Sequence, residues 1–239
     1  MKAIVLAGGL GNRLRSRVPD LPKPMAPVAG RPFLEHVLDP LVAAGIGPIV
    51  LSVGYRAESI RDHFGQAYRG AALAYAVETE PLGTGGAIAL AGAATPDEPC
   101  LVVNGDTYLD VDFAAVVDWY RQSPERFAMV LTRVPDVARY GAVTTVAGRV
   151  VQLHEKGGHG PGLINAGAYL LQPRVFGDFG LSGRFSLESD LLQPHCRELA
   201  PRAYVTDAFF IDIGIPEDFD RAQTLFAGGR GPAIPREVS

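Results

Sequence analysis

A chain of 239 residues, 47% hydrophobic and 20% charged, has the composition of a globular domain and is long enough to bury a sizeable core. Its formal net charge of −4 gives no overall basic field, so we expect no nucleic-acid partner. The apolar run at the start is too short for a signal peptide and no window approaches a membrane span, so we expect a cytoplasmic protein without a membrane partner. The two widely separated cysteines, Cys100 and Cys196, are expected to be reduced structural thiols.

The first predicted element is a short buried strand at residues 4–6 that stops at the glycine-rich segment 7–11. Glycines let the backbone approach a ligand closely, and successive N–H groups in such a loop form an anion-binding concavity. Four cations that would suit a polyphosphate follow it: Arg13, Arg15, Arg17 and Lys23. The alternative is an ordinary strand–helix turn followed by a solvated basic loop, because a glycine-rich loop alone is a weak signal.

Two common phosphate-binding motifs are excluded at this loop. The dinucleotide-binding fingerprint requires a third glycine three residues after Gly11, where the chain has Leu14. The Walker P-loop requires Gly-Lys-Ser/Thr, and that triplet does not occur in the chain.

Strands and helices alternate through the first half of the chain. We predict strands at 49–53, 73–77 and 100–104, and helices at 32–45, 57–64, 84–94 and 112–120. Pro40 should kink or divide the first of these helices, while Thr84 and Asp112 should cap the last two. The alternation favours a parallel sheet with helices on both faces.

From residue 127 onward the pattern changes to short strands separated by Gly and Pro turns. The predicted strands are 129–134, 142–146, 150–153, 170–171 and 209–213. Residues 186–199 should be helical in part, and Pro216 should begin the last helix. No linker interrupts the chain, so we expect one domain at 1–227 and a flexible tail at 228–239.

Two aspartates each accompany an apolar strand. Asp106 follows the strand 100–104 and Gly105, and Asp212 lies between two isoleucines. In α/β sheets ligands bind beyond the carboxyl ends of the strands, which is where we expect both acids. A carboxylate there needs a cation or hydrogen-bond donors, so a metal site and a purely structural pairing are both open on residue type alone.

The segment 6–14 and Pro22-Lys23-Pro24 strongly resemble the signature of the sugar-phosphate nucleotidyltransferase family, L-A-G-G-x-G-T-R-L followed by P-K-P. Asn12 stands where the family usually has Thr, and it lacks the hydroxyl. The resemblance implies a three-layer α/β/α Rossmann-like (GT-A-like) fold with a mainly parallel mixed sheet. It also implies condensation of an NTP with a sugar 1-phosphate to give an NDP-sugar and pyrophosphate.

The same resemblance implies roles for individual residues. The catalytic cations would be Arg13 and Lys23, and Mg²⁺ would be held by Asp106 and Asp212. Expected nucleotide contacts are Leu6, Ala7, Gly8, Gly9, Gly11, Asn12, Glu80, Gly83, Thr84, Asn104 and Gly105. Expected sugar-phosphate contacts are Tyr140, Gly141, Glu155, Lys156 and Asn165, which makes 1–126 the nucleotide-binding half and 127–227 the sugar-phosphate-binding half.

Within the family, the segments 51–55, 80–86, 104–107 and 210–216 look most like the heptose 1-phosphate guanylyltransferases, over about residues 1 to 226. That branch implies GTP as donor, with Glu80 reading the guanine edge, and a manno-configured heptose 1-phosphate as acceptor. The alternatives are another NDP-sugar pyrophosphorylase, for mannose, glucose or MurNAc 1-phosphate with UTP, dTTP or CTP, and a non-catalytic sugar-nucleotide-binding paralogue. A homo-oligomer is possible in each case.

Overall fold

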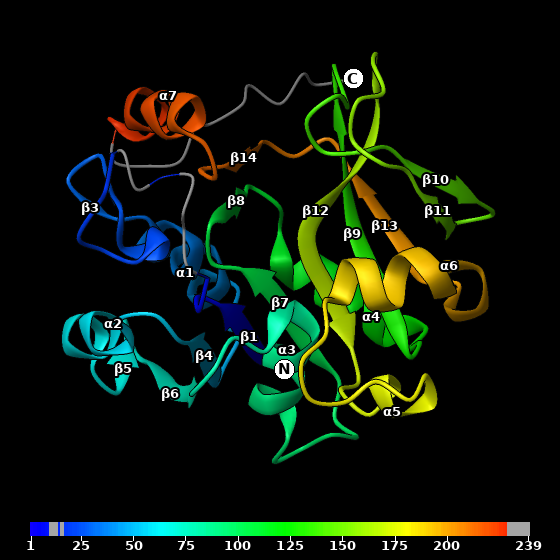
Figure 1. The fold of residues 1–239 in the computed structure, drawn as a ribbon, viewed down its shortest axis with the longest axis horizontal. Coiled ribbons are helices and arrows are strands. Elements are labelled where there is room, and N and C mark those ends of the chain that lie inside the picture. The colour runs from blue at the N-terminus through cyan, green and yellow to red at the C-terminus, as the bar shows by residue number, and fades with distance from the viewer. Residues whose placement is uncertain (10–13, 15–16, 229–239) are drawn as a thin grey trace.

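The computed structural model describes residues 1–9, 14 and 17–228, and its centre is a ten-stranded mixed sheet (Figure 1). In sheet order the strands are β10 (Val143–Val146), β11 (Arg149–Leu153), β13 (Arg202–Thr206), β9 (Phe127–Val134), β12 (Gly162–Leu171), β7 (Cys100–Asn104), β1 (Lys2–Leu6), β4 (Ile49–Val53), β6 (Ala71–Val77) and β5 (Ala67–Tyr68).

Strand direction gives the sheet its mainly parallel character. β7, β1, β4 and β6 are mutually parallel neighbours, and β13 is parallel to β9. β12 runs antiparallel to both β7 and β9, so β9 and β13 point the same way as the first four. Near-continuous apolar runs such as Ile4-Val5-Leu6 suit parallel strands that are covered on both faces. The predicted mixed, mainly parallel sheet is confirmed.

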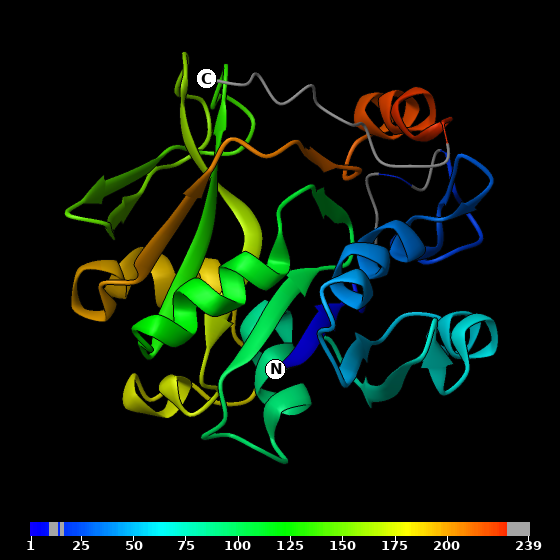
Figure 2. The ribbon, with the colours of Figure 1, turned by 180° about the vertical axis from the view of Figure 1, so that it is seen from behind.

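The helices cover the sheet in two layers. They are α1 (Phe33–Ala43), α2 (Ala57–Phe64), α3 (Gly83–Gly92), α4 (Phe113–Gln122), α5 (Val175–Asp178), the π-helical turn η3 (Leu187–Leu192), α6 (Gln193–Leu199) and α7 (Pro216–Phe226). Residues of α1, α2, α4 and α7 share one core with Val5, whereas residues of α3, α5, η3 and α6 share a second core with Ile4. Figures 1 and 2 show α3 and α6 on one face and α1 and α4 on the other. Because side chains alternate along a strand, β1 serves both cores, and the three-layer prediction is confirmed.

Two short strand pairs lie outside the large sheet. β2 (Pro27–Val28) pairs with β3 (Arg31–Pro32) after a 3₁₀ turn, η2 (Lys23–Met25). β8 (Thr107–Leu109) pairs with β14 (Phe210–Asp212), with Asp212 opposite Thr107. The predicted strand 209–213 is therefore real, but it joins the edge of the site through β8 rather than through the large sheet.

Local predictions met mixed outcomes. Helix 57–64 and the cap by Asp112, whose carboxylate accepts from the Ala115 N–H at 3.1 Å, are confirmed. Pro40 lies inside α1 without dividing it. The predicted cap at Thr84 is wrong, because α3 begins at Gly83 and the Thr84 hydroxyl is engaged elsewhere.

In the second half, the predicted strand 170–171 is the end of the ten-residue β12, and β13 was not predicted at all. Both cysteines are buried and free, and burial raises the pKa of the Cys100 thiol to about 12. Within the described part of the chain, no helix combines the length and the apolarity that crossing a membrane demands.

Candidate functional site

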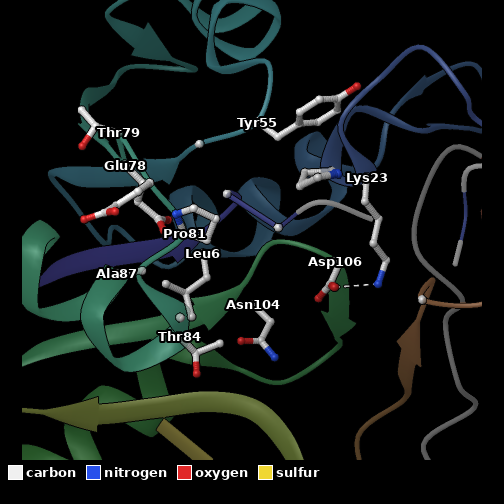
Figure 3. A pocket seen from close by; sticks show the side chains of 17 residues that line it. Leu6, Lys23, Tyr55, Glu78, Thr79, Pro81, Thr84, Ala87, Asn104 and Asp106 are labelled. Atoms are coloured by element: carbon white, nitrogen blue, oxygen red, sulfur yellow. Dashed lines mark hydrogen bonds and ion pairs between the residues drawn. The ribbon is translucent and has the colours of Figure 1, made fainter. Parts of the chain in front are cut away.

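A cavity of about 760 Å³ opens at the carboxyl edge of the parallel strands (Figure 3). The register explains its position: Leu6 lies opposite both Ser52 and Asn104, and Val53 lies opposite Val77, so the segments that follow these strands are neighbours. The predicted residues that line it are Leu6, Gly8, Gly9, Lys23, Glu80, Gly83, Thr84, Asn104 and Asp106. It is also lined by Pro24, Gly54, Tyr55, Glu78, Thr79, Pro81, Ala87 and Gly214, to which we had given no role.

Close backbone approach explains the glycine at position 8. The Ala7 N–H donates to the Ser52 carbonyl at 2.8 Å, which holds the loop against β4. A Cβ on Gly8 would lie 2.5 Å from Glu78 Oε1 and 3.2 Å from the Gly54 nitrogen. Ala7 itself is buried and does not line the cavity, so the structure gives it a supporting position.

One lysine joins the two predicted acids. Lys23 is 8% exposed, and its Nζ lies 2.6 Å from Asp106 Oδ2 and 3.2 Å from Asp212 Oδ1. The Lys23–Asp106 contact is the dashed line in Figure 3. The Ile213 N–H donates to the Asp106 carbonyl at 3.1 Å, which fixes the two acid-bearing segments side by side. The structure thus brings together three predicted residues that are far apart in the sequence.

Negative charge is in excess in this cluster. Burial, and then repulsion by Asp106, raises the pKa of the Asp212 carboxyl, while Lys23 and the Gly214 N–H act in the opposite direction. A Cβ on Gly214 would lie 2.9 Å from both Lys23 Nζ and Asp212 Oδ1, so a larger residue there would require these side-chain ends to shift. Two carboxylates and one ammonium leave one negative charge that a further cation could offset.

The start of α3 forms another wall of the cavity. Gly83 has φ +72°, and a Cβ there would lie 2.5 Å from the Phe185 carbonyl oxygen. That same oxygen accepts the N–H groups of Gly85 and Gly86 at 3.1 and 3.2 Å. The start of α3 is thus held by the segment before η3, and these N–H groups are already satisfied within the fold.

Glu78 is the acid that sequence reasoning missed. It directly follows β6, lines the cavity, and accepts the Leu82 N–H at 3.0 Å and the Ser52 hydroxyl at 3.4 Å. The rule that singled out Asp106, an acid just after an apolar strand, applies equally to Glu78 and would have found it. Glu80, the residue we had expected at the base, lines the same cavity.

The five expected sugar-phosphate residues do not line this cavity. The Gly141 N–H donates to the Val137 carbonyl at 3.1 Å, so this donor is engaged within the fold. The Tyr140 ring packs edge-on against Phe210 at 5.3 Å. The others lie on the second half of the chain: Glu155 beside Gln193, Lys156 exposed, and Asn165 bonded to Tyr169.

Some predicted residues are outside the site as described. Gly11, Asn12, Arg13 and Arg15 lie outside the described residues. Arg17 pairs with Asp220 at 2.7 Å and does not line the cavity, so it is not a cavity cation. Gly105 also does not line the cavity, but its N–H bonds to the Leu6 carbonyl at 2.9 Å and supports β1.

Comparison with known proteins places this site in context. The chain is 42% identical over 223 residues to a D-glycero-alpha-D-manno-heptose 1-phosphate guanylyltransferase of Aneurinibacillus thermoaerophilus, covering 93% of this chain and 97% of that protein. It is 40% identical over 220 residues to the enzyme of the same name from Campylobacter jejuni, with 92% and 97% coverage. The crystal structure of HddC from Yersinia pseudotuberculosis complexed with GMP-PN superposes with a TM-score of 0.82 at 36% identity, covering 94% of this chain and 99% of that one.

The match to the family extends over nearly all of the described chain. The model of the family described as "Nucleotidyl transferase" matches residues 2–227, which include every strand of the large sheet and the Lys23–Asp106–Asp212 cluster. This match, together with the 42% identity to a relative of which the chain covers 97%, shows that the chain belongs to the nucleotidyl transferase family.

Proposed function

We propose that the protein transfers a guanylyl group from GTP to D-glycero-α-D-manno-heptose 1-phosphate and releases pyrophosphate. The observation that carries a nucleotidyl transfer is the Lys23–Asp106–Asp212 cluster beside the 760 Å³ cavity. The choice of GTP and heptose phosphate rests on the named relatives, which match this chain along almost their whole length.

In this reaction the protein contributes mainly the positioning of the substrates and the neutralisation of charge. The acceptor phosphate is already ionised at neutral pH, so its oxygen can attack the α-phosphorus of GTP without a general base. The bond to the β-phosphate breaks and pyrophosphate leaves with its electron pair. Lys23 is assigned to the charge on the five-coordinate phosphorus, and Arg13 to the departing pyrophosphate.

Asp106 and Asp212 suit a divalent metal ion. Enzymes of this family generally use such an ion. Here both carboxylates contact one buried ammonium, and the cluster of three groups carries a net negative charge. Among the described residues no group of three or more His, Cys, Asp or Glu could hold a metal, so two acids and phosphate oxygens would have to share it, the oxygen-rich set that Mg²⁺ prefers. When bound, Mg²⁺ would neutralise charge between the triphosphate and the acceptor phosphate.

The two substrates are assigned to the two halves of the chain. Apart from Gly214, the residues that line the cavity lie within 1–126, which supports this half as the nucleotide-binding part. Residues 127–227 carry the expected acceptor contacts Glu155, Lys156 and Asn165. Glu78 and Glu80 give the cavity two carboxylates, which can accept but not donate hydrogen bonds and so complement the N1–H and amino group of guanine.

The test is pyrophosphate release by the purified protein with Mg²⁺, across GTP, UTP, dTTP and CTP and across heptose, mannose and glucose 1-phosphates. We expect the highest kcat/KM with GTP and the manno-configured heptose phosphate. Equal use of UTP and GTP would remove the guanylyl assignment but leave the nucleotidyl transfer. Nucleotide binding without turnover of any pair would point instead to a regulatory paralogue.

A further inference from the structure

A chain of hydrogen bonds joins Asn165, in the expected acceptor half, to Thr84, which lines the cavity. Asn165 Nδ2 lies 2.6 Å from the Tyr169 hydroxyl, which lies 3.2 Å from Glu188 Oε1. The other carboxylate oxygen, Glu188 Oε2, lies 2.8 Å from Thr84 Oγ1. Thr84 lines the nucleotide cavity, and Figure 3 shows its hydroxyl oxygen pointing away from Asn104.

The chemistry of the groups fixes the direction of each bond. An ionised carboxylate only accepts, so the Tyr169 and Thr84 hydroxyls must both donate to Glu188. Burial of Tyr169 raises its pKa well above the ordinary value, so the phenol keeps its proton. With that proton committed, the Tyr169 oxygen accepts from Asn165.

The amide of Asn165 is oriented as a result. Its NH₂ group faces Tyr169, and its Oδ1 accepts the Gly167 N–H at 3.0 Å. An amide held at both ends cannot flip, so one N–H and one lone pair of Asn165 keep fixed directions. The Thr84 hydroxyl is held in the same way, because it also accepts the Leu187 N–H at 2.8 Å.

The backbone around Glu188 is shaped for this contact. Glu188 is in η3, a π-helical turn, and such turns are rare and frequent at functional sites. Ser186 caps the turn by accepting the Ser189 N–H at 3.2 Å, and its hydroxyl also lies 3.3 Å from Glu188 Oε2. Glu188 and Ser186 belong to no motif that we identified in the sequence.

We propose that Glu188 is a positioning residue that orients Asn165, through Tyr169, toward the acceptor sugar and at the same time holds Thr84 at the nucleotide cavity. This inference rests on the proposed function for the identity of the two substrates. The Glu188 carboxylate then couples the two subsites. Loss of the Glu188 charge disturbs both subsites, whereas loss of the Tyr169 hydroxyl disturbs only the acceptor subsite.

The experiment compares Glu188→Gln, Tyr169→Phe and the double variant with wild type. Glutamine keeps the size of Glu188 but replaces one accepting oxygen with a donor, so either the Thr84 or the Tyr169 bond must reverse. Asp190→Asn is the matched control, because Asp190 is exposed in the same turn and caps the Ser186 N–H, which asparagine can still do. KM for each substrate, kcat, Tm and the calorimetric Kd for GTP are measured for all variants.

We expect Tyr169→Phe to raise the acceptor KM about tenfold with the GTP KM within about twofold of wild type. Glu188→Gln should raise both KM values and the Kd for GTP. The acceptor KM of the double variant should be no higher than that of Glu188→Gln, because both changes break the same chain of hydrogen bonds. A role in folding alone would instead lower Tm and leave each KM unchanged.

Each outcome separates this inference from the proposed function. Suppose that the wild type turns over. If both single variants keep the wild-type acceptor KM, or if their effects on the acceptor KM multiply in the double variant, the coupling is overturned but the activity is not. Absence of turnover in wild type would overturn the activity. The coupling would then stand only if Glu188→Gln weakens GTP binding at least about threefold while Tyr169→Phe and Asp190→Asn do not.

Discussion

Replacement of Lys23 by methionine should cost both stability and activity, and the cost in stability should depend on pH. Methionine fills much the same space, but it removes the ammonium that lies 2.6 Å from Asp106 and 3.2 Å from Asp212. Removing one partner of a buried ion pair costs about 3–5 kcal/mol. Because the Asp106 and Asp212 side chains are 36% and 33% exposed, water replaces part of the lost interaction, and we expect about 1–3 kcal/mol.

That loss corresponds to a fall in Tm of about 3–10 °C for a chain of this size. The sign of the pH dependence follows from Asp212. Its pKa is raised in the folded state by burial and by Asp106, and loss of Lys23 raises it further. An acid with a raised folded pKa destabilises the protein above that pKa, and protonation relieves the penalty as pH falls toward the ordinary value of 3.8. The deficit of Lys23→Met should therefore be largest at pH 7–8 and smaller at pH 5.

The assay is thermal unfolding at pH 5 and pH 8 together with steady-state turnover, with Lys156→Met as the control for loss of an exposed lysine. Lys23→Met should lower kcat by at least about 10²-fold, the effect of losing one preorganised charge at a reacting centre. Lys156→Met should melt like wild type, and any effect should fall on acceptor KM. A Lys23→Met protein that melts like wild type at pH 8, or with the same deficit at both pH values, would refute the charge balance described for this cluster.

Three further predictions concern the same cavity. Asp106→Asn and Asp212→Asn should each lower kcat at least about 10²-fold across a Mg²⁺ titration, and Asp212→Asn should not lower Tm at pH 8. Near-normal turnover of either variant at limiting Mg²⁺ would contradict a metal role. Gly8→Ala should raise the KM for GTP about tenfold, because its methyl group would lie 2.5 Å from Glu78 Oε1 and displace that carboxylate in the cavity. An unchanged KM would show that the position of Glu78 does not matter for GTP. Glu80→Gln should reduce the preference for GTP over UTP, measured as a ratio of kcat/KM, by about tenfold, and an unchanged ratio would remove Glu80 from base recognition.

The first half of the fold was predictable because its strands and helices have clean hydrophobic periodicities. Strands such as β4 and β7 are mostly apolar, with Ser52 and the terminal Asn104 as their only polar residues, and their bounds agree with the prediction. Most of β12 was not predicted, because Gly162, Asn165 and Gly167 interrupt its hydrophobic pattern. Its register with β9 also shifts between Asn165 and Ala168. A bulged strand loses the regular alternation on which sequence reasoning depends.

The site was predictable only as far as local rules reach. Asp106 follows an apolar strand, so the geometry of a parallel sheet places it at the ligand edge, and the same rule would have identified Glu78. Glu188 follows no such rule, because its partners Thr84 and Tyr169 meet it only through the packing of η3 against α3 and β12. Thr84 is 104 positions from Glu188 and Tyr169 is 19 positions from it, and hydrogen bonds across such separations carry no local signature in a single sequence.

Asp212 lies with Asp106 at Lys23, as we expected, but the argument that placed it there was incomplete. We expected it at the carboxyl edge of the large sheet, but it arrives there on β14, which pairs only with the three-residue β8 in the described structure. That short pair needs support from outside, and the Tyr140 ring provides it by packing against Phe210, two residues before Asp212. The expected acceptor-binding half therefore holds one of the two proposed metal ligands in place. Because the Asp106 carbonyl accepts the Ile213 N–H, a shift of β14 would move Asp212 relative to both Asp106 and Lys23. The geometry of the charged cluster thus depends on how the second half of the chain packs, and not on the large sheet alone.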